Sequence, residues 1–173
     1  MTTSRIYVES LDEDTKKSRL GTTQGQIYLL AQAVTQQARR LSESHSVTHT
    51  EHQADAILFI YALRGTLQLA ALAAALAPSD DAARIRGALA EFNTTVPRSK
   101  DARDVLAHLD EYVVGFGRRQ EPGDPPVLPW FSRREADYVV RLGDIAINVQ
   151  AAELAAINLR TTVLLLETRE DQF

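Results

Sequence analysis

The stretch from Ala54 to Ala77 is nearly all apolar, and it constrains the fold more than any other part of the sequence. Its length and composition fit either a helix buried in a protein core or a helix that crosses a membrane. Arg64 and Gln68 fall near its middle, where a charge is costly in lipid. Alanine and other modest side chains make up much of the remainder. We therefore expect a helix buried on most faces in a helical bundle, and no membrane contact.

The overall composition is that of an ordinary soluble globular protein. The 173 residues are 45% hydrophobic and 24% charged, which predicts a single domain over residues 1–173. The net charge of -4 excludes a general polyanion binder, so a nucleic-acid contact would need a local basic patch. The chain has no cysteine, which excludes disulfides, thiolate metal sites and cysteine nucleophiles. Met1 to Leu20 is polar and charged rather than a signal peptide, so we expect a cytoplasmic protein.

Helical periodicity, caps and breaks divide most of the chain into five to six helices. Residues 1–20 are expected to form an arm or a first helical turn. The Thr48-His49-Thr50-Glu51 pattern is a capping box, and Pro78-Ser79-Asp80 is expected to stop one helix and cap the next. The expected helices cover Gly21 to Ser44, the capping box to Ala77, Asp80 to Asn93, Lys100 to Phe116 and Gln150 to Thr168.

Two segments in the C-terminal third are not predicted to be helical. Gln120 to Pro129 contains four prolines, which exclude a helix or a central strand and predict a loop. Residues 137–149 hold two runs rich in β-branched side chains around Gly143-Asp144, which favours a small hairpin; helical spacing through Leu142, Ile145 and Val149 is the alternative. The predicted fold class is mainly α, a helical bundle with a small C-terminal β-hairpin.

The segment from Ser99 to Tyr112 contains the candidate catalytic residues of the chain. Arg103 is followed by the polar Asp104 and, five positions on, by His108, whose imidazole can move protons at physiological pH. At about 100° per residue, one polar strip runs along the helix beside its apolar stripe. The members of that strip are Asp101, Asp104, His108, Glu111 and Tyr112.

Within this strip, Asp104, His108 and Tyr112 are successive i, i+4 neighbours within hydrogen-bonding reach. A carboxylate beside an imidazole fixes its tautomer and raises its basicity, as acid-base chemistry requires. Arg103 would point about 140° away from His108 on an ideal helix. A two-fold symmetric dimer would bring both residue types to one cleft, so we predict a homodimer with His108 and Tyr112 near the axis.

Arg103-Asp-Val-Leu-Ala-His108, on a late helix of a small helical domain, resembles the Arg-x4-His motif of the HEPN superfamily. The resemblance implies a dimeric helical bundle with the arginine and histidine of both copies facing a cleft. It also implies a metal-independent endoribonuclease of a toxin-antitoxin, defence or RNA-processing system, with RNA as substrate and a cognate antitoxin or other protein as partner. In that function His108 is the general acid or base, Arg103 stabilises phosphate charge and Asp104 orients the site.

The acidic strip around His108 favours an alternative, a catalytically inactive helical module that binds a nucleotide or a protein partner. Equally, the strip can be a solvated helix face with local ion pairs. For binding, we single out Glu111 and a local basic patch of Arg118, Arg119, Arg133 and Arg134. The neighbouring Trp130-Phe131 pair can stack on a base or anchor a loop onto the core.

The sequence predicts neither a metal site nor a cofactor site. His45, His49 and His52 have spacings that would suit zinc on one continuous helix, but they lie in a polar connector, where histidines usually face solvent. The sequence contains no phosphate-binding glycine loop and no His-Glu-x-x-His pattern.

Overall fold

The computed structural model describes residues 8–43, 49–108, 129–134 and 137–166. Within those ranges the side chains of residues 49–50, 103, 129–134 and 137 are not described. The described elements are α2 (Glu13–Glu43), α3 (His49–Leu76), α4 (Ser79–Thr95), α5 (Ser99–Ala107), β1 (Pro129–Arg134), β2 (Asp137–Leu142), β3 (Ile145–Asn148) and α7 (Val149–Leu164). The predicted class, mainly α with a small hairpin, is confirmed.

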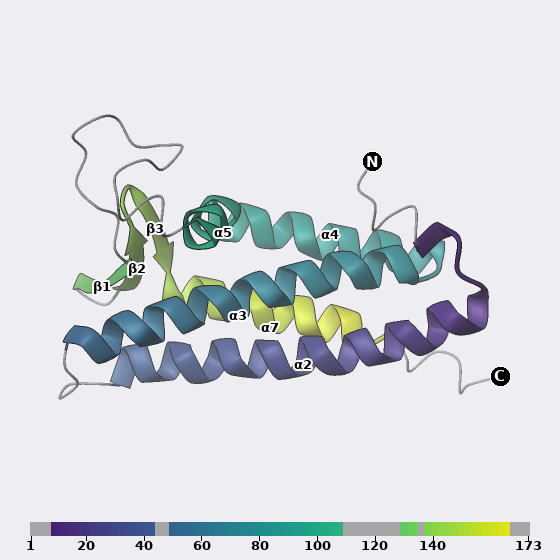
Figure 1. Cartoon of the computed structure of the whole chain (residues 1–173), viewed down its shortest axis with the longest axis horizontal. Helices are drawn as coiled ribbons and strands as arrows, with labels where there is room; N and C mark the ends of the chain where they lie inside the picture. Colours follow the sequence, from purple (N-terminus) through teal and green to yellow (C-terminus); the bar gives the residue numbers. More distant parts are fainter. Residues whose placement is uncertain (1–7, 44–48, 109–128, 135–136, 167–173) are drawn as a thin grey trace.

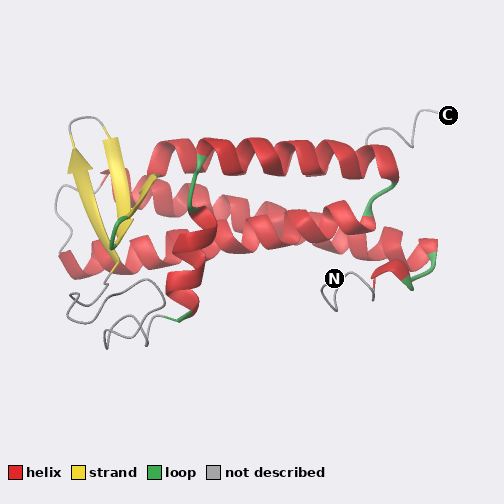
Figure 2. Cartoon of the chain, turned by 90° about the horizontal axis from the view of Figure 1, so that it is seen from above, coloured by secondary structure: helices red, strands yellow, loops and turns green. Residues whose placement is uncertain are grey.

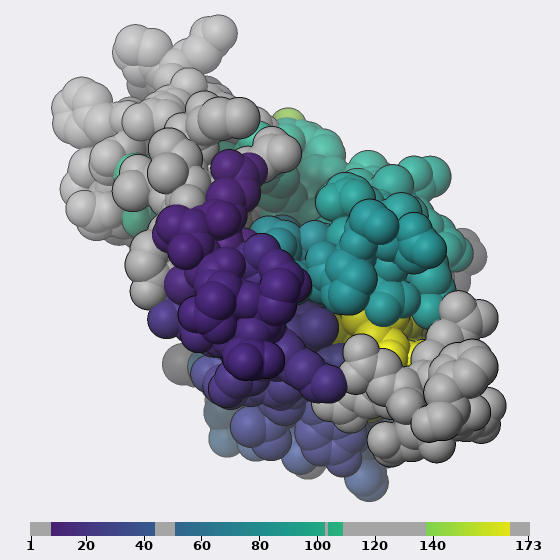
Figure 3. Space-filling model, turned by 90° about the vertical axis from the view of Figure 1, so that its right-hand side faces the viewer, coloured from purple at the N-terminus to yellow at the C-terminus, as the bar shows by residue number. Residues whose placement is uncertain are grey.

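Four helices, α2, α3, α4 and α7, form the bundle, and the sheet and α5 lie at one end of it (Figure 1). Figure 2 shows α5 running across the long axis of the bundle, directly after α4. The opposite end is formed by the start of α2, the α3–α4 turn and the end of α7 (Figure 3). The largest fully buried side chains come from every bundle helix: Ile27, Phe59, Ile85, Phe92 and Leu159.

Helix α2 is longer than predicted and includes part of the expected arm. It begins at Glu13, so residues 13–20 are helical, and Leu20 packs against the core. Asp12 caps it: the Asp12 carboxylate accepts the Thr15 backbone N–H and hydroxyl, each at 2.8 Å. The Thr15 N–H bond is the main reason that the pKa of Asp12 is lowered. This cap and the burial of the Thr23 side chain outweigh the weak helix propensity of the Gly21-Thr-Thr segment.

Helix α3 contains the apolar stretch, and it lies in the bundle as predicted. It packs against α2, α4 and α7. Its Glu51–Leu76 part is the one described segment that is long and apolar enough to cross a membrane, and 44% of its most apolar window is buried in the molecule. Asp55, on this helix, is buried and pairs with Arg40 of α2 at 2.9 Å. The start at His49 agrees with the capping box, whose Thr48 lies outside the described residues.

Helix α4 begins at Ser79 rather than Asp80 and continues to Thr95, two residues past its predicted end. Pro78, in the segment predicted to separate the two helices, occupies the N-cap position, and no side-chain hydrogen bond caps α4. The Ser79 hydroxyl instead donates to the Asp80 carboxylate at 3.2 Å.

The predicted hairpin is present, and it has a third strand. β2 and β3 pair antiparallel around Gly143, whose φ of 59° lies in the left-handed region that favours glycine. β1 pairs with the other edge of β2, which gives the order β1-β2-β3. The predicted loop ended at Pro129; that residue instead starts β1, a position where a strand tolerates proline because β1 is at the edge.

Strand β3 leads directly into α7, which begins at Val149 and ends at Leu164, short of the predicted Thr168. The Asn148 side chain caps α7 by accepting the Ala151 N–H at 2.9 Å. This cap fixes the direction in which the chain leaves the sheet and enters the bundle.

Candidate functional site at α5

Helix α5 carries the predicted motif, and its apolar side fixes it to the end of the bundle. Ala102, Val105 and Leu106 are buried in the core, while Asp101 and Asp104 are half-buried. The helix contacts α3 and β3. Asp101 and Asp104 therefore lie at the junction between bundle and sheet.

His108 is the residue at which α5 ends, so the prediction of one helix from Lys100 to Phe116 is wrong at this point. Its φ of -124° and ψ of 35° are not helical, and its N–H bonds to the Val105 carbonyl at 3.3 Å. That bond spans three residues instead of four and tightens the last turn. The imidazole is half-buried.

This ending changes two expectations. The i, i+4 series from Asp104 through His108 to Tyr112 requires a continuous helix, and the described helix does not continue through His108. The separation of about 140° between Arg103 and His108 was also a property of an ideal helix. Because His108 has left the helix, that angle no longer determines where its ring points.

The remaining predicted site residues are placed only in part. Arg103 lies in the second half of α5, and its side chain is not described. Glu111, Tyr112, Arg118 and Arg119 lie outside the described residues. Arg133 and Arg134 are in β1, paired in register with Tyr138 and Asp137, and Trp130 and Phe131 belong to the same strand.

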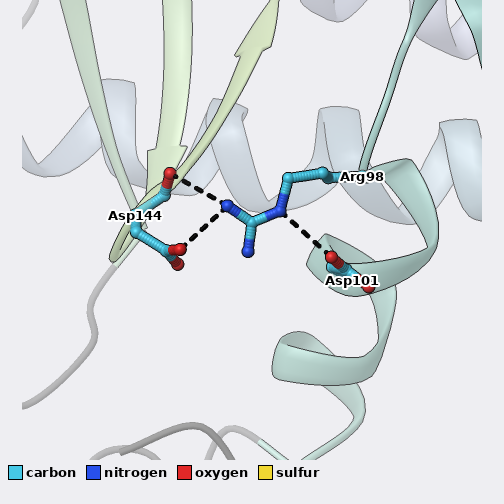
Figure 4. Close-up of polar contacts among 3 residues, drawn as sticks. All are labelled: Arg98, Asp101 and Asp144. Carbon is cyan, nitrogen blue, oxygen red and sulfur yellow. Dashed lines mark hydrogen bonds and ion pairs between the residues drawn. The ribbon is translucent and has the colours of Figure 1, made fainter.

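An arginine that the sequence analysis did not single out holds the start of α5. The Arg98 Nε donates to Asp101 at 3.1 Å, and its Nη1 donates to the Asp144 carboxylate at 2.8 Å and to the Asp144 carbonyl at 3.4 Å (Figure 4). Asp101 is in the first turn of α5, and Asp144 is in the turn between β2 and β3. We call these three residues the Arg98 clamp.

The bond to Asp144 is the main cause that raises the pKa of Arg98, and the bond to Asp101 adds to it. Both carboxylates stabilise the guanidinium charge. Arg98 thus pairs with two acidic side chains, one in α5 and one in the β2–β3 turn. No short-range sequence pattern indicates the clamp, because Arg98 and Asp144 are 46 residues apart.

Outside α5, the bundle encloses several polar groups. Glu153 of α7 is partly buried; burial raises its pKa, and a hydrogen bond with Thr35 of α2 opposes that rise. Over the described ranges, Gln37 Oε1 and Arg64 Nε are buried side-chain atoms with no hydrogen-bond partner. These groups lie on the bundle helices α7, α2 and α3.

The predicted histidine positions near α3 are also placed in part. His45 lies outside the described residues, His49 opens α3, and His52 is half-buried in its first turn. Across the part of the chain that the structure describes, no group of three or more His, Asp or Glu side chains could hold a metal ion.

Comparisons with known proteins add no family to this description. No family model matches the chain, and no curated protein or solved structure matches it either.

Proposed function

We propose that the chain is a HEPN-like domain, a metal-independent endoribonuclease that cleaves single-stranded RNA in the cytoplasm as part of a toxin-antitoxin or defence system. One observation carries the proposal. Arg103 lies in a short helix of a helical bundle, and His108 is the residue at which that helix ends.

The chemistry assigned to each residue follows from its side chain. His108 would accept or donate the proton that moves during strand cleavage, since imidazole is the side chain best matched to neutral pH. Arg103 would stabilise the negative charge that develops on the phosphate, a role suited to a planar, permanently charged guanidinium. Asp104, half-buried on the same helix, would orient the site.

A homodimer belongs to this proposal, because a two-fold axis near α5 would supply two copies of each residue to one cleft. His108 is the C-terminal cap of α5, a position compatible with such an arrangement.

The test is cleavage of a labelled single-stranded RNA by micromolar purified protein in the presence of a chelator. We expect cleavage by the wild type, and a loss of at least about 100-fold in the His108→Ala and Arg103→Ala variants, as for removal of an acid-base group. Arg86→Ala is the matched control, because Arg86 is exposed on α4. Intact RNA with the wild type, or equal cleavage by wild type and His108→Ala, would overturn the proposal.

A second function, an inactive module that binds a partner or a nucleotide, is favoured by the charges around α5. Asp101 and Asp104 on the helix and Asp144 in the adjacent turn place carboxylates at the end of the bundle, and carboxylates repel a phosphate backbone. If the wild type leaves RNA intact and its expression is no more harmful than that of His108→Ala, this second function is preferred.

A further inference from the structure

Two segments that are distant in the sequence meet at the Arg98 clamp, and both have left-handed backbone there. Arg98 has a φ of 66°, the one positive φ among the non-glycine residues that the structure describes, and Gly143, next to Asp144, has a φ of 59°. Glycine adopts this conformation freely, whereas arginine does so only when its surroundings impose it. The contacts of its side chain with Asp101 and Asp144 therefore account for an arginine, and not a glycine, at this position.

The left-handed residue turns the chain from α4 into α5. The Ser99 N–H bonds to the Val96 carbonyl at 3.4 Å, and the Ala102 N–H bonds to the Arg98 carbonyl at 3.0 Å, which starts α5. The backbone at Arg98 thus ends a tight turn and begins the helix that crosses the bundle. Its side chain reaches from this turn to the hairpin (Figure 4).

The contacts use different nitrogens of one rigid group. Nε faces Asp101 and Nη1 faces Asp144, so the planar guanidinium fixes the two carboxylates relative to each other. A lysine, with a single charged nitrogen, could reach one of them but could not hold both in this geometry.

We propose that Arg98 is a positioning residue that links the start of α5 to the β2–β3 turn, so that α5 and the hairpin unfold locally together and not separately. The part of this inference that concerns catalysis rests on the proposed function, because α5 carries Arg103 and His108. The mechanical part, that Arg98 couples α5 to the hairpin, rests only on the contacts of the Arg98 clamp.

Hydrogen-deuterium exchange of the full chain tests the mechanical part. In Arg98→Ala, Arg98→Lys and Asp144→Ala, we expect exchange to rise about two- to fivefold, the factor that an exposed ion pair supports, in residues 99–108 and 137–148 together. Exchange in α2 should not change. Adding Asp144→Ala to Arg98→Ala should add nothing, because the first change already removes the shared contact.

Two further variants separate the clamp from other causes. Arg98→Gly removes the side chain and also relieves the cost of the left-handed backbone, so its exchange should rise less than that of Arg98→Ala. Arg84→Ala breaks the Arg84–Asp81 pair within α4, at 3.4 Å, and should leave α5 and the hairpin unchanged. Unchanged exchange in Arg98→Ala and Asp144→Ala, or a rise in α5 without a rise in the hairpin, would overturn the proposal.

If the wild type cleaves RNA, Arg98→Lys should lower kcat several-fold while KM changes little, since the clamp orients the reacting groups and does not bind the substrate. Equal kcat in Arg98→Lys and wild type would refute the link to catalysis even if exchange shows the clamp. If the wild type does not cleave RNA, the proposed function fails, and the exchange measurements alone decide whether the clamp couples α5 to the hairpin.

Discussion

Gln24 shows how one polar side chain can be needed inside an apolar core. It is 3% exposed, and its Nε2 donates to the Val163 carbonyl at 3.0 Å. Val163 is in the last turn of α7, where backbone carbonyls have no partner within the helix. The amide of Gln24 therefore satisfies a buried acceptor that the helix itself leaves open.

Replacing Gln24 with leucine should lower the free energy of unfolding by about 1–3 kcal/mol, the cost of a buried carbonyl without a donor. Urea denaturation followed by circular dichroism measures the change. Gln26→Leu is the control, because Gln26 is exposed on the same helix and its replacement should change stability by less than about 0.5 kcal/mol. Equal stabilities of the two variants would show that the Val163 carbonyl does not depend on Gln24.

Among the helices, two glycines differ in what surrounds them. A Cβ added at Gly87, exposed in α4, would meet nothing within 4 Å. A Cβ at Gly65 in α3 would lie 2.6 Å from Cδ1 of Leu30, so Gly65 makes room for a side chain of α2.

Alanine at Gly87 should therefore raise the free energy of unfolding by about 0.5–1 kcal/mol, the difference in helix propensity. Gly65→Ala should not give this gain, because Leu30 must move. In a Leu30→Ala background the same Gly65→Ala change should become stabilising by a similar amount, which a double-mutant cycle of thermal unfolding measures. A gain at Gly65 in the wild-type background would show that Leu30 moves at no cost.

The elements that local chemistry specifies are the ones that the sequence predicted best. Gly143-Asp144 marked the hairpin turn, and the capping box marked the start of α3. Residues 1–20 were expected to form an arm or a first helical turn, and the long helix was expected to start at Gly21, whereas α2 begins at Glu13. The packing of Leu20 against the core, which supports this longer helix, has no local signal. β1 was missed because the prolines before it suggested a loop, while its pairing with β2 is a tertiary contact.

For the candidate site, the sequence located the motif but not its geometry. The sequence predicted one continuous helix from Lys100 to Phe116, whereas His108 takes a non-helical conformation. The clamp escaped prediction for a similar reason. An arginine after Val96-Pro97 has no local feature that indicates a left-handed backbone, and its partner Asp144 belongs to another element.

For the molecule as a whole, an ion pair links α2 and α3 at the end of the bundle that holds the sheet. Arg40 of α2 donates from Nε to Asp55 of α3 at 2.9 Å; the Asp55 side chain is 5% exposed and that of Arg40 is 63% exposed. A buried carboxylate that loses its cation is strongly destabilising.

We expect Arg40→Ala to lower the free energy of unfolding by about 1–3 kcal/mol, less than for a fully buried pair because Arg40 is largely in water. Arg39→Ala is a close control: Arg39 pairs with Glu43 one turn along α2, both side chains are exposed, and the change should be within about 0.5 kcal/mol. The comparison is made by urea denaturation at neutral pH, and equal losses would mean that Asp55 does not need its partner.

Helix α7 has a consequence for how the protein is made. It contacts α2, α3 and α4, and the Gln24 bond and the Arg160–Tyr28 ring contact both tie it to the first of them. During synthesis the N-terminal helices leave the ribosome first, with the apolar faces that α7 will cover still open to water. The core therefore closes only after residue 163 has emerged, and the nascent chain has to stay soluble until then.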